Sequence, residues 1–189
     1  MPGIVESIRQ GSLYIKPTFL AEDEFSSLQK KLHEYEYEEG YQPYKKYYGN
    51  RYQAYPCYHT NDIEIADPEF FKLFKDRHQE CLEEKITNFR CVIRKAITDE
   101  VKRSAINTKY GMVHRDTWGF ASTLHFVQSY DGGTAFFEDV VDRTPDIEIS
   151  AYPNRLIMYN GRRWHSPCTD FTFDERYVLV SFFECSGDE

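Results

Sequence analysis

The chain has 189 residues, of which 41% are hydrophobic and 16% are aromatic. This composition excludes a largely disordered chain, and the length predicts one domain that spans residues 1–189. Lysine and arginine together number 23 against 31 aspartates and glutamates, so the net charge of −8 argues against a nucleic-acid partner, whose phosphates attract basic surfaces.

The cysteines and the N-terminal residues indicate the compartment. The five cysteines are odd in number and form no C-x-x-C pair, so the sequence predicts neither a disulfide framework nor a zinc ribbon. Residues 1–11 contain no apolar stretch long enough for a signal peptide, and no 18 apolar residues occur in a row. We therefore expect a reducing, cytoplasmic location and no membrane insertion.

Two amphipathic helices are expected in the first half of the chain. Residues 21–35 place apolar side chains at helical spacing behind an acidic first turn, which complements a helix N-terminus. A second helix is expected to begin at Pro68, with Asp67 as its N-cap, and to run to about Lys85. Both patterns predict helices that pack one face on a core.

The segment between these helices has no steady period. Residues 35–58 carry nine tyrosines, interrupted by glycine and proline. The missing period predicts a long loop. Because phenol rings give broad contact area at low entropy cost, this loop either closes over a substrate as a lid or packs against the sheet.

From about residue 89 the chain changes to short β-rich runs, separated by turn residues such as Asp131-Gly132-Gly133. The runs are FRCVIRKAI, YGMVHRD, ASTLHFVQS, TAFFED, RLIMYN and RYVLVSFFE. In the last run both alternating faces are apolar, which is typical of a strand inside a sandwich. Helices followed by many strands predict an α+β chain, with residues 1–88 as helical support and Tyr-rich loop and residues 89–189 as a jelly-roll core.

Three residues in the second half have the chemistry of a metal site. His114 and Asp116 lie two positions apart at an expected strand end, so both side chains leave on the same face about 7 Å apart at the backbone. His165 follows the run RLIMYN and supplies a third donor 49 positions after Asp116. Two imidazoles and one carboxylate leave other positions of a metal open, an arrangement that suits Fe(II) and dioxygen.

Arg176 begins the last run, eleven positions beyond His165 and in line with the apolar Val178 and Val180. A buried guanidinium needs a partner, and its planar fork binds a carboxylate through two parallel hydrogen bonds. The pattern predicts that Arg176 binds the far end of a dicarboxylate whose other end chelates the metal.

Each of these pieces has another reading when taken alone. The triplet His114-Arg115-Asp116 also occurs in the catalytic loop of protein kinases, but here TWGFAS follows it, and the chain has neither a Gly-rich phosphate loop nor D-F-G. A His-x-Asp pair is more often a hydrogen-bonded surface pair, and an isolated arginine is more often in a structural ion pair. The prediction depends on all the pieces occurring in order, with strands between them.

That order resembles the Fe(II)/2-oxoglutarate dioxygenases, particularly their prolyl-4-hydroxylase-like branch. The resemblance covers residues 110–184, with the matching segments YGMVHRD, STLHFVQSYDGGTAFF, NRLIMYNGRRWHSP and ERYVLVSFF. It implies a double-stranded β-helix (jelly-roll) core, Fe(II) held by His114, Asp116 and His165, and 2-oxoglutarate gripped by Arg176.

The sequence departs from the family pattern at two places. Prolyl hydroxylases usually have lysine where this chain has Arg176, so the identity of the substrate is not implied. Their Gly-Gly-x-Thr element is shortened here, which leaves Thr134 as a candidate hydroxyl near the co-substrate. Tyr110 is a further candidate for the co-substrate site, although a tyrosine beside a glycine is as often a packing residue. His125, in the middle of a run, is expected to be a core or rim histidine outside the site.

The resemblance also implies the reaction. Dioxygen and 2-oxoglutarate would be consumed, with release of succinate and CO2, while an unidentified peptide, prolyl or small-molecule substrate is hydroxylated. Asp116 argues against halogenation, because related halogenases replace this carboxylate by a small residue. The alternative is a non-catalytic jelly-roll protein with a structural metal, which would need a fourth protein ligand, and Cys168 is the nearest candidate. Metal affinity is expected to fall as the pH drops through the histidine range.

Overall fold

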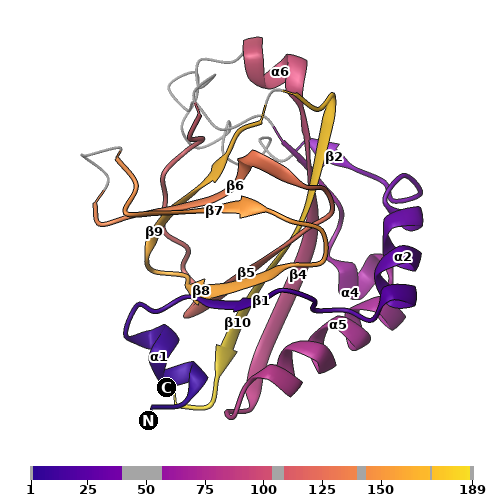
Figure 1. The fold of residues 1–189 in the computed structure, drawn as a ribbon. Helices are drawn as coiled ribbons and strands as arrows, with labels where there is room; N and C mark the ends of the chain where they lie inside the picture. Colours follow the sequence, from indigo (N-terminus) through magenta and orange to yellow (C-terminus); the bar gives the residue numbers. More distant parts are fainter. Residues whose placement is uncertain (1, 40–56, 104–108, 140–143, 171, 188–189) are drawn as a thin grey trace.

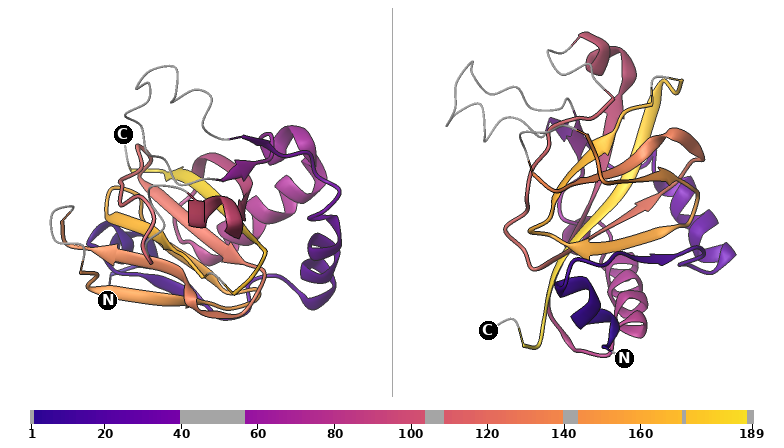
Figure 2. Two further views of the ribbon diagram at one scale, coloured as in Figure 1. Left: turned by 90° about the horizontal axis from the view of Figure 1, so that it is seen from above. Right: turned by 60° about the vertical axis from the view of Figure 1, so that its left-hand side comes forward.

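Two antiparallel β-sheets face each other, and the helices lie on the outside (Figures 1 and 2). The computed structural model describes residues 2–39, 57–103, 109–139, 144–170 and 172–187. The larger sheet has the strand order β1-β8-β5-β10-β4-β3-β2, and the smaller has the order β7-β6-β9. This is the α+β double-stranded β-helix that the sequence predicts.

The larger sheet is built around its two longest strands, β4 (Ile86–Ile97) and β10 (Glu175–Cys185). Its other members are β1 (Tyr14–Lys16), β2 (Glu38–Glu39), β3 (Tyr58–His59), β5 (Phe120–His125) and β8 (Leu156–Asn160). The smaller sheet consists of β6 (Ser129–Phe137), β7 (Ile147–Ala151) and β9 (Trp164–Cys168). No helix of the described residues is long and apolar enough to cross a membrane.

Helices cover one face of the larger sheet (Figure 1). They are α2 (Glu22–Lys31), α4 (Ile63–Ala66) and α5 (Pro68–Cys81), while α1 (Ile4–Arg9) packs near β8 and α6 (Thr98–Arg103) follows β4. The predicted start of α5 is confirmed, because Pro68 is its first residue and Asp67 Oδ1 accepts a hydrogen bond from the backbone N–H of Phe70 at 3.1 Å. Both predicted helices end earlier than their apolar patterns, α2 at Lys31 and α5 at Cys81.

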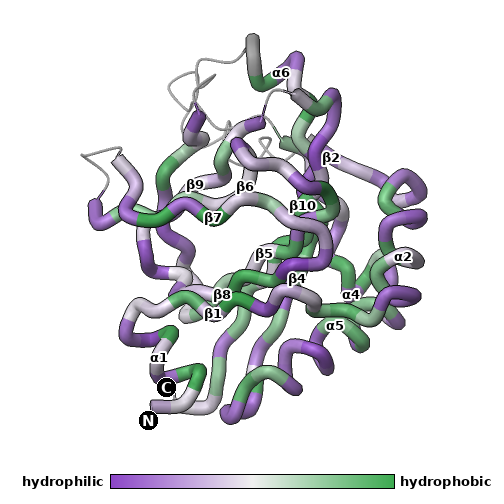
Figure 3. Tube along the Cα trace, viewed as in Figure 1, coloured by the Kyte–Doolittle hydropathy of each residue, from purple (hydrophilic) through white to green (hydrophobic). Residues whose placement is uncertain are grey.

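The alternation of β10 divides the interior into two parts. Tyr177, Leu179 and Phe183 belong to the main hydrophobic core under the helices, which Figure 3 shows as apolar segments of β4, β5 and β10. Val178 and Val180 point the other way, into the space between the two sheets. Because both faces of β10 meet other layers, both are apolar, as the sequence indicates.

The Asp-Gly-Gly element does not separate two strands, which corrects the expected turn. It lies inside β6, where the pairing register with β7 shifts between Ser129 and Gly133. Gly133 has a φ of +125°, and a Cβ there would lie 2.0 Å from the carbonyl oxygen of Ile149. Only glycine fits this β-bulge, because it tolerates positive φ and leaves room for the neighbouring backbone.

Two further expectations are corrected in detail. The run YGMVHRD forms no strand of its own, but isolated bridges join Tyr110 to Cys168 and His114 to His165. His165 itself lies on β9, a separate strand that the sequence did not indicate. The expected lid falls largely on residues 40–56, which lie outside the described residues, while its flanks pair as β2 and β3 at the edge of the larger sheet.

Candidate active site

The backbone brings the two histidines of the predicted triad face to face. His114 and His165 form an antiparallel bridge, in which the N–H of His114 donates to the carbonyl of His165 at 2.9 Å and the reverse bond measures 3.0 Å. The N–H of Asp116 donates to the carbonyl of Gly161 at 2.8 Å, just before β9. Three backbone hydrogen bonds therefore fix the loop that carries His114 and Asp116 against the strand that carries His165.

Side-chain hydrogen bonds then orient both imidazoles in the same sense. His114 Nδ1 lies 2.9 Å from the carbonyl oxygen of Met112, and His165 Nδ1 lies 2.9 Å from that of Arg163. A carbonyl only accepts, so each Nδ1 carries the proton and each Nε2 presents its lone pair. The Nε2 atoms of His114 and His165 lie 3.7 and 3.4 Å from the carboxylate oxygens of Asp116.

Burial keeps the two imidazoles of this cluster in the neutral form that a metal requires. It lowers the pKa of His165 to about 3, with the neighbouring His114 adding to the effect, and it also lowers the pKa of His114. Burial raises the pKa of Asp116, because the carboxylate is more costly to desolvate than the acid. The imidazoles are therefore neutral at physiological pH, and a cation among the three groups would stabilise the ionised carboxylate.

One atom of the cluster lacks a partner altogether. Asp116 Oδ2 is buried and accepts no hydrogen bond from any described residue. Leaving such an atom unpaired costs free energy, and a bound cation would satisfy it. In the part of the chain that the structure describes, the triad is the only group of three histidine, cysteine or acidic residues whose ligand atoms all lie within 4.8 Å of one another.

The triad lies at a cavity of about 500 Å³ between the two sheets. Three neighbouring strands of the larger sheet form its floor in cross-strand rows: His125, Val178 and Arg94 in one, and Thr123, Val180 and Val92 in the next. A cavity of this size holds a co-substrate and part of a second ligand, since pockets for small molecules usually measure about 300–1,000 Å³.

Arg176 lines this cavity and is 93% buried, since only 7% of its surface is exposed. Its Nη1 donates to the carbonyl of Cys168, and its Nη2 donates to the carbonyl of Gly133 at 3.4 Å. These are two hydrogen bonds for a group with five N–H donors. The charge of Arg176 acts on the nearby carboxyl of Asp170, but that carboxyl is hydrogen-bonded to Ser129 and Thr172, and no described carboxylate forms an ion pair with Arg176. A carboxylate ligand would therefore find free guanidinium donors there.

Of the other two residues predicted for the co-substrate site, one lines the cavity and one does not. Thr134 is buried on β6 and lines the cavity. Tyr110 does not line it: its hydroxyl donates to the carboxylate of Glu148, and its ring packs against Phe137 at a centroid distance of 5.5 Å. The packing role, which the sequence left open, accounts for these contacts of Tyr110.

His125, which the sequence left outside the site, lines the cavity on β5. Burial lowers its pKa to about 3, with the charges of Arg176 and Arg155 adding to the effect, and its Nε2 has no hydrogen-bond partner among the described residues. Arg94 on β4 also lines the cavity. Both residues alternate with core residues along their strands. This alternation shows which residues share a face of the sheet, but it does not show that the face of His125 and Arg94 borders a cavity.

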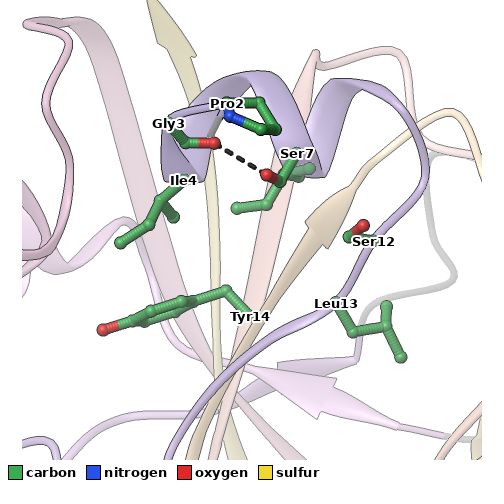
Figure 4. Close-up of a pocket in the computed structure, with 8 residues that line it drawn as sticks. Pro2, Gly3, Ile4, Ser7, Ser12, Leu13 and Tyr14 are labelled. Atoms are coloured by element: carbon green, nitrogen blue, oxygen red, sulfur yellow. Dashed lines mark hydrogen bonds between the residues drawn. The ribbon is translucent and has the colours of Figure 1, made fainter.

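Two other features of the structure, the thiol of Cys168 and a small hollow near α1, lie outside the cavity. Cys168 packs with Ala135 and Phe137, on the face of β9 opposite to His165, and burial raises the pKa of its thiol to about 12. A hollow of about 230 Å³ lies between α1 and β1. Figure 4 shows the residues that line it, among them Ser7, whose Oγ donates to the carbonyl of Gly3 at 2.8 Å. The residues that line this hollow include no acid, imidazole or thiol.

Comparison with known proteins identifies the fold through solved structures. No protein-family model matches the sequence, and no curated protein matches it. A prolyl-4-hydroxylase from Pseudomonas putida is similar in structure over 97% of this chain and 98% of its own, with a TM-score of 0.59 and 14% sequence identity. The chain has the fold of the 2-oxoglutarate/Fe(II) oxygenases.

Two further structures with this oxygenase fold span most of the chain. HygX from Streptomyces hygroscopicus, with nickel, 2-oxoglutarate and hygromycin B bound, matches 97% of this chain and 86% of its own at a TM-score of 0.63 and 10% identity. An oxidoreductase of the 2OG-Fe(II) oxygenase family from Burkholderia pseudomallei matches 95% of this chain and 88% of its own, with a TM-score of 0.57 and 15% identity. The oxygenase fold therefore includes the N-terminal helices as well as the core.

Proposed function

We propose that this protein is a non-haem Fe(II) dioxygenase that couples oxidative decarboxylation of 2-oxoglutarate to hydroxylation of a second substrate. The observation that carries the proposal is the triad: two imidazoles with their Nε2 atoms turned inward, and a buried Asp116 oxygen without a partner. These donors fit Fe(II), which accepts a 2-His-1-carboxylate face and keeps other positions open. His114, Asp116 and His165 would be the metal ligands.

The charges in the cavity suit a dianionic co-substrate. Fe(II) with the Asp116 carboxylate has a net charge of +1, and Arg176 adds another, so the dianion 2-oxoglutarate would be neutralised. Arg176 would bind the distal carboxylate, while Thr134 and His125 offer a hydroxyl and an imidazole nitrogen within the same cavity. The walls of this cavity would position the substrate C–H bond and limit the access of water.

When bound, the iron would supply the oxygen chemistry that no side chain provides. In the balanced reaction, one oxygen atom of dioxygen enters succinate as CO2 leaves, and the other enters the substrate as a hydroxyl. Reducing both atoms of dioxygen takes four electrons: 2-oxoglutarate supplies two as it loses CO2, and the substrate C–H bond supplies the other two. The protein's residues would bind and orient both reactants around the triad.

The solved structures support the reaction class without fixing the second substrate. One is a prolyl-4-hydroxylase, one holds hygromycin B, and another, SnoN, is an alpha-ketoglutarate-dependent epimerase from nogalamycin biosynthesis. Peptides and small molecules thus both remain in the proposal. Hydroxylation is preferred over epimerisation, because the substrate C–H bond then supplies the two electrons that reduce the second oxygen atom, whereas epimerisation leaves the substrate at its original oxidation level.

The alternative, a structural metal in a non-catalytic protein, has less support. A structural zinc ion is usually closed by a fourth protein ligand. Cys168, the only nearby candidate in the sequence, packs on the opposite face of β9, and no fourth histidine, cysteine or acidic residue of the described chain joins the triad.

The experiment that tests the proposal is the measurement of succinate formed from 2-oxoglutarate, Fe(II) and air. The native protein is expected to form succinate as 2-oxoglutarate disappears, and Asp116→Ala is expected to lower the rate by about 100-fold or more, because the metal loses its only anionic ligand. The matched control is Asp76→Ala on the outer helix α5, where the carboxylate is 56% exposed and pairs with Lys72. Equal succinate from the native protein and Asp116→Ala would refute the proposal.

A further inference from the structure

Arg94 is a half-buried cation of the cavity without an anionic partner. It lies on β4, lines the cavity, and forms no ion pair with any carboxylate of the described residues. Its guanidinium lies over the ring of Phe182, whose centroid is 6.0 Å from the Cζ atom, and its positive charge also acts on the Asp116 carboxyl without forming an ion pair with it. By contrast Arg90, four positions earlier on the same face, pairs with Asp62 at 2.8 Å. A partly desolvated charge in this position is costly unless a ligand completes it.

The strand register separates Arg94 from the place proposed for the co-substrate. Arg176 pairs with Ala96, Val178 with Arg94, and Phe182 with Arg90, so the contact with Phe182 draws the Arg94 guanidinium away from Arg176. Each second residue along a strand adds about 7 Å. The two guanidinium groups therefore serve different ends of the cavity floor.

The charge count leads to the same separation. Asp116 is the only carboxylate among the residues that line the cavity. Fe(II), Asp116 and Arg176 together have a charge of +2, which the 2-oxoglutarate dianion cancels. Of the other arginines that line the cavity, Arg90 is paired with Asp62, and Arg115 is exposed and stacks on the ring of Trp164. The half-buried charge of Arg94 therefore remains without an ion pair after the co-substrate has bound. An arginine fork recognises planar or tetrahedral oxyanions by paired, charge-assisted hydrogen bonds.

We propose that the second substrate carries an oxyanion, either a carboxylate or a phosphate, that Arg94 binds while an adjoining apolar part lies on Phe182. This inference rests on the proposed function and adds the chemical class of its substrate. Phe182 contacts Trp118 at a centroid distance of 6.3 Å, so an aromatic surface continues beside the guanidinium. With its anionic end at Arg94, the substrate would present a C–H bond to the triad from the side opposite to Arg176.

The test is calorimetric titration with benzoate and phenyl phosphate, which combine an aromatic ring with each kind of oxyanion, and with neutral benzyl alcohol. The protein is loaded anaerobically with Fe(II) and saturating 2-oxoglutarate, so that Arg176 is occupied. At least one of the two anions is expected to bind at least about tenfold more tightly than benzyl alcohol, because a hydrogen bond to a charged group usually contributes a factor of this size to affinity. The tighter of the two anions identifies the oxyanion.

Arg94→Met is expected to remove the advantage of the anion, while the matched variant Arg90→Met keeps it within about twofold because Arg90 is already paired. The affinity for 2-oxoglutarate should stay unchanged in Arg94→Met. Should Arg94→Met fail to fold, Arg94→Lys against Arg94→Gln makes the same comparison of charged and neutral side chains.

Three results would overturn the inference: equal anion binding by native protein and Arg94→Met, an equal loss in Arg90→Met, or a loss of 2-oxoglutarate affinity in Arg94→Met. The last result would assign Arg94 to the co-substrate. If the native protein binds no 2-oxoglutarate, the proposed function fails instead. The comparison of native protein with Arg94→Met in the metal-free state then still decides whether Arg94 binds oxyanions.

Discussion

Replacing Arg176 by leucine tests the co-substrate site. Arg176 is 93% buried and its guanidinium is bonded to two backbone carbonyls, so a bound carboxylate would form a desolvated, charge-assisted pair with it. Removing one member of such a pair costs about 2–5 kcal/mol, which corresponds to a loss of roughly 30-fold or more in 2-oxoglutarate affinity. Arg176→Lys should retain part of the affinity, because a point charge remains although the planar fork is lost.

The assay is calorimetric titration of 2-oxoglutarate into each Fe(II)-loaded variant under anaerobic conditions. Iron affinity should not change, because Arg176 is not among the three grouped ligands. Arg155→Leu is the matched control, since Arg155 contacts the ring of Tyr152 at 4.9 Å and does not line the cavity. Native affinity in Arg176→Leu would refute the reasoning, and a loss in Arg155→Leu in its place would assign the co-substrate to Arg155.

Three further predictions concern the support of the site and its protonation. Gly161→Ala is expected to lower iron affinity by about tenfold, because a Cβ there would lie 2.5 Å from the Trp118 carbonyl oxygen and displace the loop that carries Asp116. Native iron affinity of this variant in a calorimetric titration would contradict the prediction. Iron affinity should fall by less than about tenfold between pH 7.5 and 5.5, since burial lowers the pKa of both triad histidines and leaves Asp116, whose pKa burial raises, as the remaining group at which protons compete with the metal. A fall of about 100-fold, as for two ordinary imidazoles, would contradict the lowered pKa of the histidines. His78 is fully buried, which lowers its pKa to about 4, so the unfolded chain takes up a proton first as the pH falls. Between pH 7.5 and 5 the free energy of unfolding should therefore drop by about 2 kcal/mol more in the native protein than in His78→Phe. An equal drop in the two proteins, measured by urea denaturation at both pH values, would exclude this role.

The sequence predicts those parts of the fold whose residue pattern follows from local rules. The start of α5 depends on Asp67 and Pro68, which act within one helical turn. The two apolar faces of β10 follow from its place between the helices and the cavity, and alternation reports this directly. His114 and Asp116 are neighbours in the chain, so their common face follows from strand geometry.

Features that depend on long-range contacts are not visible in the sequence. His165 lies on β9, whose residues WHSPC show no alternation, and this strand exists because β6 pairs with it. Asp-Gly-Gly reads as a turn, but the backbone of β7 beside Gly133 makes it a bulge within β6. His125 and Arg94 alternate with core residues on their strands, and only the packing of the two sheets decides that their face borders a cavity.

The fall in metal affinity expected from the sequence is also modified by burial. An exposed histidine would lose a metal near pH 6.5, whereas desolvation in the closed site shifts the pKa of both ligands downward. Sequence alone gives the residue type and thus the ordinary pKa. The shift depends on the aromatic side chains around the site, including Tyr159, whose ring centroid lies 4.8 Å from that of His165.

The central claim is that Fe(II) and 2-oxoglutarate bind together at His114, Asp116 and His165. The most direct measurement is the visible absorption spectrum of the protein after anaerobic addition of Fe(II) and then 2-oxoglutarate. A weak metal-to-ligand charge-transfer band is expected to develop in the native protein, only when both are present, and to be missing in Asp116→Ala. A native protein that binds Fe(II) but develops no band on saturation with 2-oxoglutarate would contradict the account.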